Sequence, residues 1–205
     1  MTFPLPFLAE LSDVDLGVGL LWYVAFLLSA VLHEASHAWT AWKLGDSTAY
    51  HAGQVSLDPI PHIRREPIGM IVIPILSLVA FGYMFGWASA PYRLDWADRY
   101  PRRVGLMALA GPLSNLALAA ISALIIALAL KGGHFVSPRE SIPLELSAPG
   151  SPLLSSIATF LGILLTLNLL LFIFNLLPVP PFDGCAVVQI FLPERIARSY
   201  QRFVR

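Results

Sequence analysis

Four long apolar stretches set the strongest limit on what this chain can fold into. They lie at about 17–44, 67–90, 103–130 and 152–177. Each meets the requirement of a transmembrane helix, which is about 20 mostly apolar residues. Charged residues make up 13% of the chain, against about 25% in soluble domains. The sequence therefore predicts an all-α, multi-pass membrane protein, built as a helix bundle from about four apolar segments.

The basic residues favour a bend in the second stretch. The thirteen Lys and Arg residues form four groups: three within 43–66, four within 91–103, two within 131–151 and four from 195 onward. If all four stretches cross the membrane, the better of the two orientations places eight of these residues on one side and five on the other. If 67–90 instead returns to the side from which it entered, eleven lie on one side and two on the other. Because basic residues concentrate on the cytoplasmic side, we expect 67–90 to be re-entrant or a bent hairpin. The N-terminus would then lie outside, although 24 apolar residues also fit one ordinary span.

The connecting segments predict smaller elements. The sequence AYHAGQVSL, residues 49–57, is typical of a short strand or hairpin, which gives a short β-like loop after the first helix. From residue 186 the chain predicts a short helix, a break at Pro193 and a basic amphipathic helix at the lipid surface. We interpret 1–205 as one domain with its core at about 17–184 and a C-terminal interfacial helix at about 185–205.

Charge and composition narrow the partners. Thirteen basic and thirteen acidic residues give a net charge of zero, which gives no indication of a nucleic-acid partner. We expect the lipid bilayer as a partner and no nucleic acid. The single cysteine, Cys185, cannot form an internal disulfide. Residues 1–15 contain no Lys or Arg, which argues against a cleavable signal peptide.

The sequence VLHEASHAW, residues 31–39, places three ionisable side chains inside the first apolar stretch. Such groups are costly in hydrocarbon and mark sites that bind or react. His33 and His37 are four residues apart, so they share one face of a helix and can bind one zinc ion. Glu34 lies beside them and can act as general base toward an activated water. The pattern H-E-x-x-H therefore predicts a zinc site.

A third ligand must come from elsewhere, because catalytic zinc usually has three protein ligands and an open position. The candidates are His51, Asp58, His62, Asp95, Asp98 and Asp183. Asp183 stands out because it follows the fourth stretch in FNLLPVPPFDG, residues 174–184, where three prolines and a glycine break the helix. It can meet the histidines only if the first and fourth stretches run in the same direction. A re-entrant 67–90 gives that arrangement.

Three motifs in this order resemble those of the site-2 protease family, intramembrane zinc metalloproteases of the peptidase M50 type. They are HEASH at 33–37, GPLSN at 111–115 and NLLPVPPFDG at 175–184. Residues 53–63, GQVSLDPIPHI, and 85–93, FGWASAPYR, are similar to the compact bacterial branch that lacks a PDZ domain. The likeness covers most of residues 25–190. The apolar stretch 67–90 is a departure, since the best-known members reach the GP-x-x-N helix without it.

The resemblance implies an endopeptidase that hydrolyses peptide bonds in or near the transmembrane segments of other membrane proteins, in the bacterial inner membrane. It implies one Zn²⁺ per chain, with His33, His37 and Asp183 as the metal ligands and Glu34 as the catalytic acid/base. Asn175 would bind the substrate backbone or the oxyanion, and Asn115 would orient substrate or brace the helices.

Other interpretations stay open at this point. An aspartate before a glycine is common in turns, so Asp183 could simply end the helix. Asn115 and Asn175 could each hydrogen-bond a neighbouring helix, as asparagines in membranes often do. The alternative function is a non-proteolytic zinc-binding membrane protein, either an inactive scaffold or a metal carrier. Glu34 discriminates between the two functions, because hydrolysis needs a carboxylate beside the first histidine and metal binding alone does not.

Overall fold

Three long helices form the frame of the molecule. The computed structural model describes residues 16–137 and 146–203. Its long helices are α2 (Leu16–Lys43), α7 (Pro101–Lys131) and α8 (Pro152–Asn175), and each is long and apolar enough to cross a membrane. They coincide closely with three of the four predicted stretches. The argument about a signal peptide concerns residues 1–15, which lie outside the described residues.

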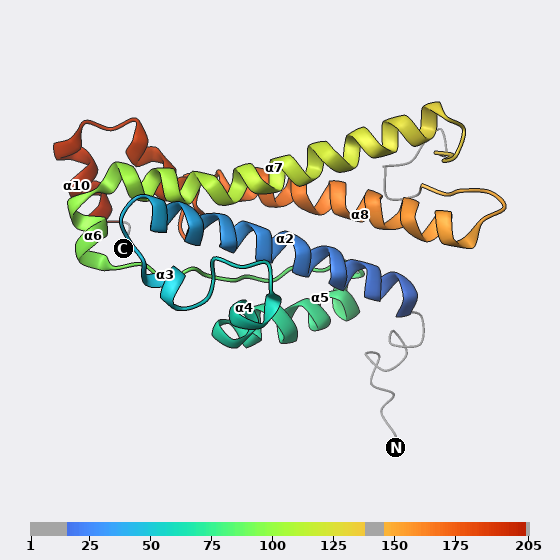
Figure 1. Ribbon diagram of the computed structural model, residues 1–205, viewed down its shortest axis with the longest axis horizontal. Coiled ribbons are helices and arrows are strands. Elements are labelled where there is room, and N and C mark those ends of the chain that lie inside the picture. Colours follow the sequence, from blue (N-terminus) through green and yellow to red (C-terminus); the bar gives the residue numbers. More distant parts are fainter. Residues whose placement is uncertain (1–15, 138–145, 204–205) are drawn as a thin grey trace, which may run out of the picture.

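The three long helices pack against one another. Figure 1 shows that α2 and α8 run in the same direction and that α7 runs the opposite way. Local signals account for the starts of two of them. Pro101 and Pro152 occupy the first helical positions of α7 and α8, where a missing N–H costs nothing. The Ser151 side chain caps α8 by accepting from the Leu154 N–H at 3.3 Å.

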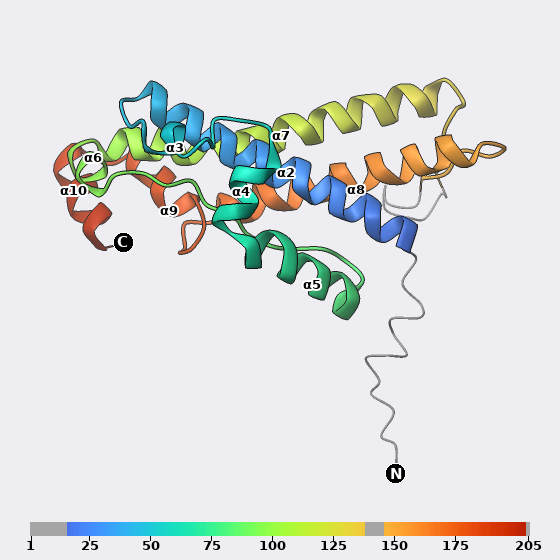
Figure 2. The ribbon, with the colours of Figure 1, turned by 60° about the horizontal axis from the view of Figure 1, so that its bottom comes forward.

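The stretch 67–90 does not form one helix of spanning length. A wide helical turn, η1 (Ile68–Val72), continues into α5 (Ile73–Phe81), which ends where Gly82 adopts φ +74°. The chain then runs back beside its own path to α6 (Leu94–Arg99) (Figures 1 and 2). The Trp87 N–H donates to the Gly69 carbonyl at 3.2 Å. The stretch is therefore a bent hairpin that returns to the level at which it began.

Two glycines allow this hairpin to close. A Cβ at Gly86 would lie 2.7 Å from Phe26 Cζ and still closer to the Gly69 carbonyl. We expect Gly86→Ala to lower the free energy of unfolding by about 1–3 kcal/mol, and so the Tm in detergent by about 2–10 °C. The exposed Ala80→Ser on α5 serves as control. An unchanged Tm for Gly86→Ala would contradict the close packing described.

The prediction of a short strand or hairpin at 49–57 is wrong, because within the described residues this segment begins as the helical turn α3 (Thr48–His51) and continues as irregular chain to α4 (Pro59–Arg65). Asp46 explains the turn. Its Oδ1 accepts from Thr48 N at 2.9 Å and Thr48 Oγ1 at 2.5 Å, and its Oδ2 accepts from Arg93 N at 2.6 Å. Burial alone would raise the pKa of Asp46, but these donors hold it below its ordinary value.

The C-terminal part follows the predicted order of a short helix, a break and a further helix. The elements are α9 (Gly184–Val187), the single turn η3 (Val188–Ile190) and α10 (Glu194–Phe203), with Pro193 at the break. One face of α10 packs on the protein through the buried Ala197 and Gln201. Gln189 donates to Gln201 at 2.6 Å and connects η3 to this helix.

Candidate metal centre

Three side chains from two distant parts of the chain meet at the surface of α2. His33 Nε2 and His37 Nε2 are 2.9 Å apart, and both histidines are buried. Asp183 Oδ2, from the turn after α8, lies 3.0 Å from His33 Nε2 and 3.3 Å from His37 Nε2. Of the six candidates for a third metal ligand, Asp183 is the one that joins the two histidines.

Tight packing brings Asp183 back to the bundle after the helix ends. A Cβ on the next residue, Gly184, would collide with the carbonyl oxygens of Leu176 and Leu177 at the end of α8. The following elements, α9 and η3, pack on α7. There a Cβ on Gly105 would lie 2.7 Å from Ile190 Cγ1. Small residues at these two contacts therefore let the proline-rich turn fold back toward α2.

Gly111 of α7 faces the cluster directly. A Cβ at this position would lie 2.5 Å from His33 Nε2 and from His37 Cε1, and closer still to His37 Nε2. Real Cβ atoms do not approach other heavy atoms so closely. A glycine is therefore required where α7 crosses the two imidazoles, which gives the first residue of GPLSN a specific structural role.

The outer nitrogen of each imidazole is held by an acceptor on α7. His37 Nδ1 lies 2.7 Å from the Met107 carbonyl, and His33 Nδ1 lies 2.6 Å from Asn115 Oδ1. A carbonyl oxygen only accepts, so both Nδ1 atoms carry their protons. When it is neutral, each imidazole presents an Nε2 lone pair to the other and to the Asp183 carboxylate. Such a convergence of lone pairs requires a cation between them, either a proton or a metal ion.

The donor set fits zinc. Donor atoms around tetrahedral zinc, with bonds of about 2.0–2.1 Å, lie about 3.3 Å apart, and the three separations here are 2.9–3.3 Å. Two imidazoles and one carboxylate are a ligand combination known from catalytic zinc sites. Glu34 lies in the same group of ionisable residues as the histidines. Its Oε2 is buried without a hydrogen-bond partner among the described residues.

Asp183 supplies negative charge to the cluster. Burial alone would raise the pKa of its carboxyl, but without metal the charge of a protonated His37 imidazole and hydrogen bonds from His33 and His37 hold that pKa well below its ordinary range. The carboxylate is therefore ionised around neutral pH, as a metal ligand must be.

The other candidate ligands have different surroundings. Asp58 caps α4 by accepting from Ile60 N at 2.9 Å, and Asp95 lies 3.6 Å from the Arg93 guanidinium. The buried His62 has its Nε2 3.1 Å from the Ser56 carbonyl. Asp98 lies in α6 and His51 is exposed in α3. These residues therefore have structural positions outside the cluster.

The two predicted asparagines are placed differently. Asn115 contacts His33 directly and is fully buried. Asn175, in the last turn of α8, donates its amide N–H to the Leu171 carbonyl of its own helix at 2.9 Å. The sequence reasoning missed Asn168, which is fully buried and hydrogen-bonded to Asn115 at 2.8 Å. An asparagine inside the apolar run ILLTLNLLLF was the available signal.

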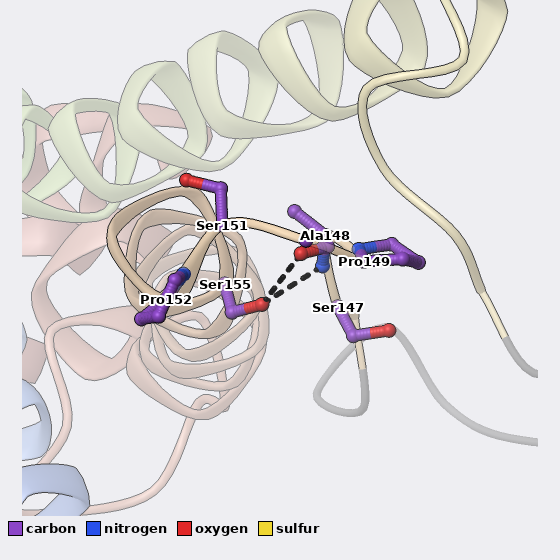
Figure 3. Close-up of a pocket in the computed structure, with 7 residues that line it drawn as sticks. Ser147, Ala148, Pro149, Ser151, Pro152 and Ser155 are labelled. Atoms are coloured by element: carbon purple, nitrogen blue, oxygen red, sulfur yellow. Dashed lines mark hydrogen bonds between the residues drawn. The ribbon is translucent and has the colours of Figure 1, made fainter.

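Two cavities lie at different distances from the cluster. A groove of about 620 Å³ runs between α2, residues 55–57 and α7, and its wall includes Leu32, Ser36 and Ser114 beside the metal-site residues. A second pocket of about 490 Å³ is lined by residues 147–152 and Ser155, whose hydroxyl bonds to the Ala148 backbone (Figure 3). It lies at the start of α8, about 35 Å along that helix from the end that leads to Asp183.

Comparisons with known proteins agree with this geometry. Residues 21–205 match the family model described as "Peptidase family M50". The chain is 34% identical over 179 residues to "Putative zinc metalloprotease YwhC" of Bacillus subtilis (strain 168), an alignment that covers 84% of this chain and 69% of that protein.

Two mycobacterial proteins named "Putative zinc metalloprotease Rip2" are also similar. The Mycolicibacterium smegmatis protein is 30% identical over 183 residues and the Mycobacterium tuberculosis H37Rv protein 32% over 185. Each alignment covers 89% of this chain and 61% of the relative, so the chain spans less than two thirds of these two proteins. No solved structure gives a significant match. The extent of the family match and the identity to YwhC establish that the chain belongs to peptidase family M50.

Proposed function

We propose that this chain is an intramembrane zinc metalloendopeptidase that hydrolyses peptide bonds in or near transmembrane segments of other membrane proteins. One observation carries the proposal: two imidazoles and a carboxylate converge on one point beside Glu34, whose buried Oε2 has no partner among the described residues. The histidines and Glu34 belong to a helix apolar enough to span a membrane. Membership of family M50 supports a metallopeptidase and supports zinc as its metal.

The proposed metal ligands are His33, His37 and Asp183. Zinc bound there supplies Lewis-acid chemistry, which activates water as a nucleophile near neutral pH and polarises a peptide carbonyl. Asn115 and the Met107 carbonyl hold the two imidazoles with their Nε2 atoms toward the ion. These outer contacts keep each ligand oriented before any substrate arrives.

Glu34 is the proposed acid/base. Within the part of the chain that the structure describes, no donor competes for the lone pairs of its Oε2, so it is available to take a proton from the attacking water and pass it to the leaving amine. Asn175 is the proposed donor to the substrate backbone or to the developing oxyanion. One of its two amide N–H groups bonds to the Leu171 carbonyl, and the second N–H is the proposed donor to the substrate.

The proposed partners are the lipid bilayer and a transmembrane substrate, with the bacterial inner membrane as the location. A transmembrane helix hides its carbonyls within its own hydrogen bonds, so the substrate must unwind locally before it is cut. The groove beside α2 is the proposed place for the unwound segment, since three serines and Thr40 place hydroxyl oxygens within a mainly apolar wall. The non-proteolytic alternative gives no use to the carboxylate of Glu34.

Removal of metal tests the proposal. We expect purified protein in detergent or liposomes to cleave some members of a panel of single-span membrane proteins. A zinc chelator should abolish cleavage, and about one equivalent of zinc per chain should restore it. The measurement is the amount and mass of each product, which places the cut within or near the span.

Each outcome is informative. Cleavage of unfolded soluble proteins alone would leave a metallopeptidase but contradict the intramembrane substrate. Zinc binding with no cleavage of any substrate would favour the non-proteolytic scaffold. Cleavage that persists after metal removal would contradict the zinc mechanism.

A further inference from the structure

Asn168 connects the metal-site helices although it lies far from any metal ligand in sequence. Its side chain is fully buried in α8. Its Nδ2 donates to Ser29 Oγ of α2 at 2.8 Å and to the Leu164 carbonyl at 2.8 Å, while its Oδ1 accepts from Asn115 Nδ2 of α7 at 2.8 Å. The Ser29 hydroxyl in turn donates to the Ala25 carbonyl at 2.7 Å. Three helices therefore meet in one hydrogen-bonded chain.

The polarity of this chain is fixed by the backbone. The Leu164 carbonyl can only accept, so the Asn168 amide turns its N–H end to it. The Ala25 carbonyl takes the Ser29 hydroxyl proton, so the Ser29 oxygen accepts from the same end of Asn168. The Asn168 oxygen is then the end that faces Asn115. Asn115 must turn its N–H to Asn168 and its oxygen to His33 Nδ1. That oxygen requires a proton on His33 Nδ1 and leaves Nε2 with its lone pair.

We propose that Asn168 is a positioning residue that fixes the Nδ1–H tautomer of His33 through Asn115, and so presents His33 Nε2 as a metal ligand. The metal-binding part of this inference rests on the zinc site proposed above. The tautomer itself follows from the hydrogen bonds among the protein's own residues.

Loss of Asn168 would remove the constraint on Asn115. The Asn115 N–H would keep only its 3.5 Å contact with the Ser29 carbonyl. The amide could then turn over and offer an N–H to His33 Nδ1. That arrangement moves the imidazole proton to Nε2, the atom that faces His37 and Asp183, where it blocks coordination.

Nitrogen NMR of histidine-labelled protein reads the tautomer directly. In the wild type at mildly alkaline pH without metal we expect His33 to carry its proton on Nδ1, with the resonance assigned by its loss in His33→Gln. In Asn168→Leu we expect a substantial fraction of the His33 imidazole to carry its proton on Nε2 instead. Asn168→Asp keeps an oxygen that accepts from Asn115 and should restore much of the Nδ1–H form. If His33 stays fully in the Nδ1–H form in Asn168→Leu, the proposal is overturned.

Zinc affinity, measured by competition with a chelator, gives the functional consequence. We expect Asn168→Leu to raise the Kd for zinc about 10–100-fold, as outer-shell substitutions do. Asn115→Leu should have a similar effect. The double variant should bind zinc no more weakly than the weaker-binding single variant, because both residues act on His33 through the same hydrogen bonds. The half-buried Thr166→Val on α8 is the matched control and should bind as the wild type does.

Two results separate this inference from the proposed function. Additive effects of Asn115→Leu and Asn168→Leu would show independent structural roles and overturn the inference. A wild type that binds no zinc would overturn the proposed function, while the His33 tautomer would still decide whether Asn168 positions it. Asn168→Asp that folds and binds zinc within about tenfold of the wild type would support the inference even if Asn168→Leu fails to fold.

Discussion

Replacing Glu34 by glutamine is expected to leave zinc bound and to slow peptide hydrolysis by about 10²–10⁴-fold or more. The amide has nearly the shape of the carboxylate, so the packing of this buried position is preserved. It cannot take up a proton, so the step that turns water into a nucleophile loses its base. The proposed zinc ligands, His33, His37 and Asp183, are untouched, and metal content should therefore stay at the wild-type level.

The measurement pairs zinc content with cleavage of one membrane substrate under single-turnover conditions. Glu66→Gln provides the matched control. Glu66 accepts a hydrogen bond from Ser89 at 2.6 Å, and neither residue belongs to the cluster of His33, His37 and Asp183. Its cleavage rate should equal that of the wild type. If Glu34→Gln keeps zinc and still cleaves at the wild-type rate, Glu34 is not the base.

Replacing Gly111 by alanine is expected to abolish zinc binding at micromolar metal. The added methyl group would occupy the space of the two Nε2 atoms, since its Cβ lies 2.5 Å from His33 Nε2. Relief requires α7 to move away from α2 or the imidazoles to rotate, and either change removes the ligands from their common point. Peptidase activity should disappear together with the metal.

The matched control is Gly132→Ala at the other end of α7. There a Cβ meets His134 Cδ2 at 2.9 Å, on an exposed side chain that can turn aside. We expect this variant to bind zinc as the wild type does. Circular dichroism should show that both variants keep their helices, so that lost metal binding is not mistaken for unfolding. A Gly111→Ala protein with normal zinc affinity would contradict the geometry of the site.

The spanning helices and the core of the site could be predicted from the sequence because both signals are local. An apolar run of more than 20 residues leaves the backbone no partner other than itself, so α2, α7 and α8 follow from composition. The spacing of His33 and His37 follows from the helical repeat. The common direction of α2 and α8 could be argued from the need of Asp183 to reach them, and it is observed.

The rest depends on contacts between distant segments. The predicted strand at 49–57 failed because Asp46 caps a helical turn while it holds the backbone of Arg93, and no pattern within nine residues reveals that second contact. The hairpin at 67–90 needs Gly69 and Gly86 to pass each other, so the two glycines are informative only as a pair.

The roles of Gly111 and Asn168 at the site also depend on contacts between distant segments, so the sequence does not reveal them. Gly111 was recognised as part of a motif, but its reason, the space of two imidazoles from another helix, requires the packed structure. Asn168 was passed over because a lone asparagine in an apolar helix has many possible partners. Its importance comes from the particular partners Asn115 and Ser29 on two other helices.

Zinc content together with X-ray absorption at the zinc edge of the purified wild type tests the central claim, a zinc site made by His33, His37 and Asp183. We expect about one zinc per chain, with two imidazoles and oxygen ligands at about 2.0–2.1 Å and no sulfur. A protein that takes up no zinc would contradict it. So would a sulfur ligand at about 2.3 Å, which would place Cys185, two residues beyond Asp183, in the position assigned to the carboxylate.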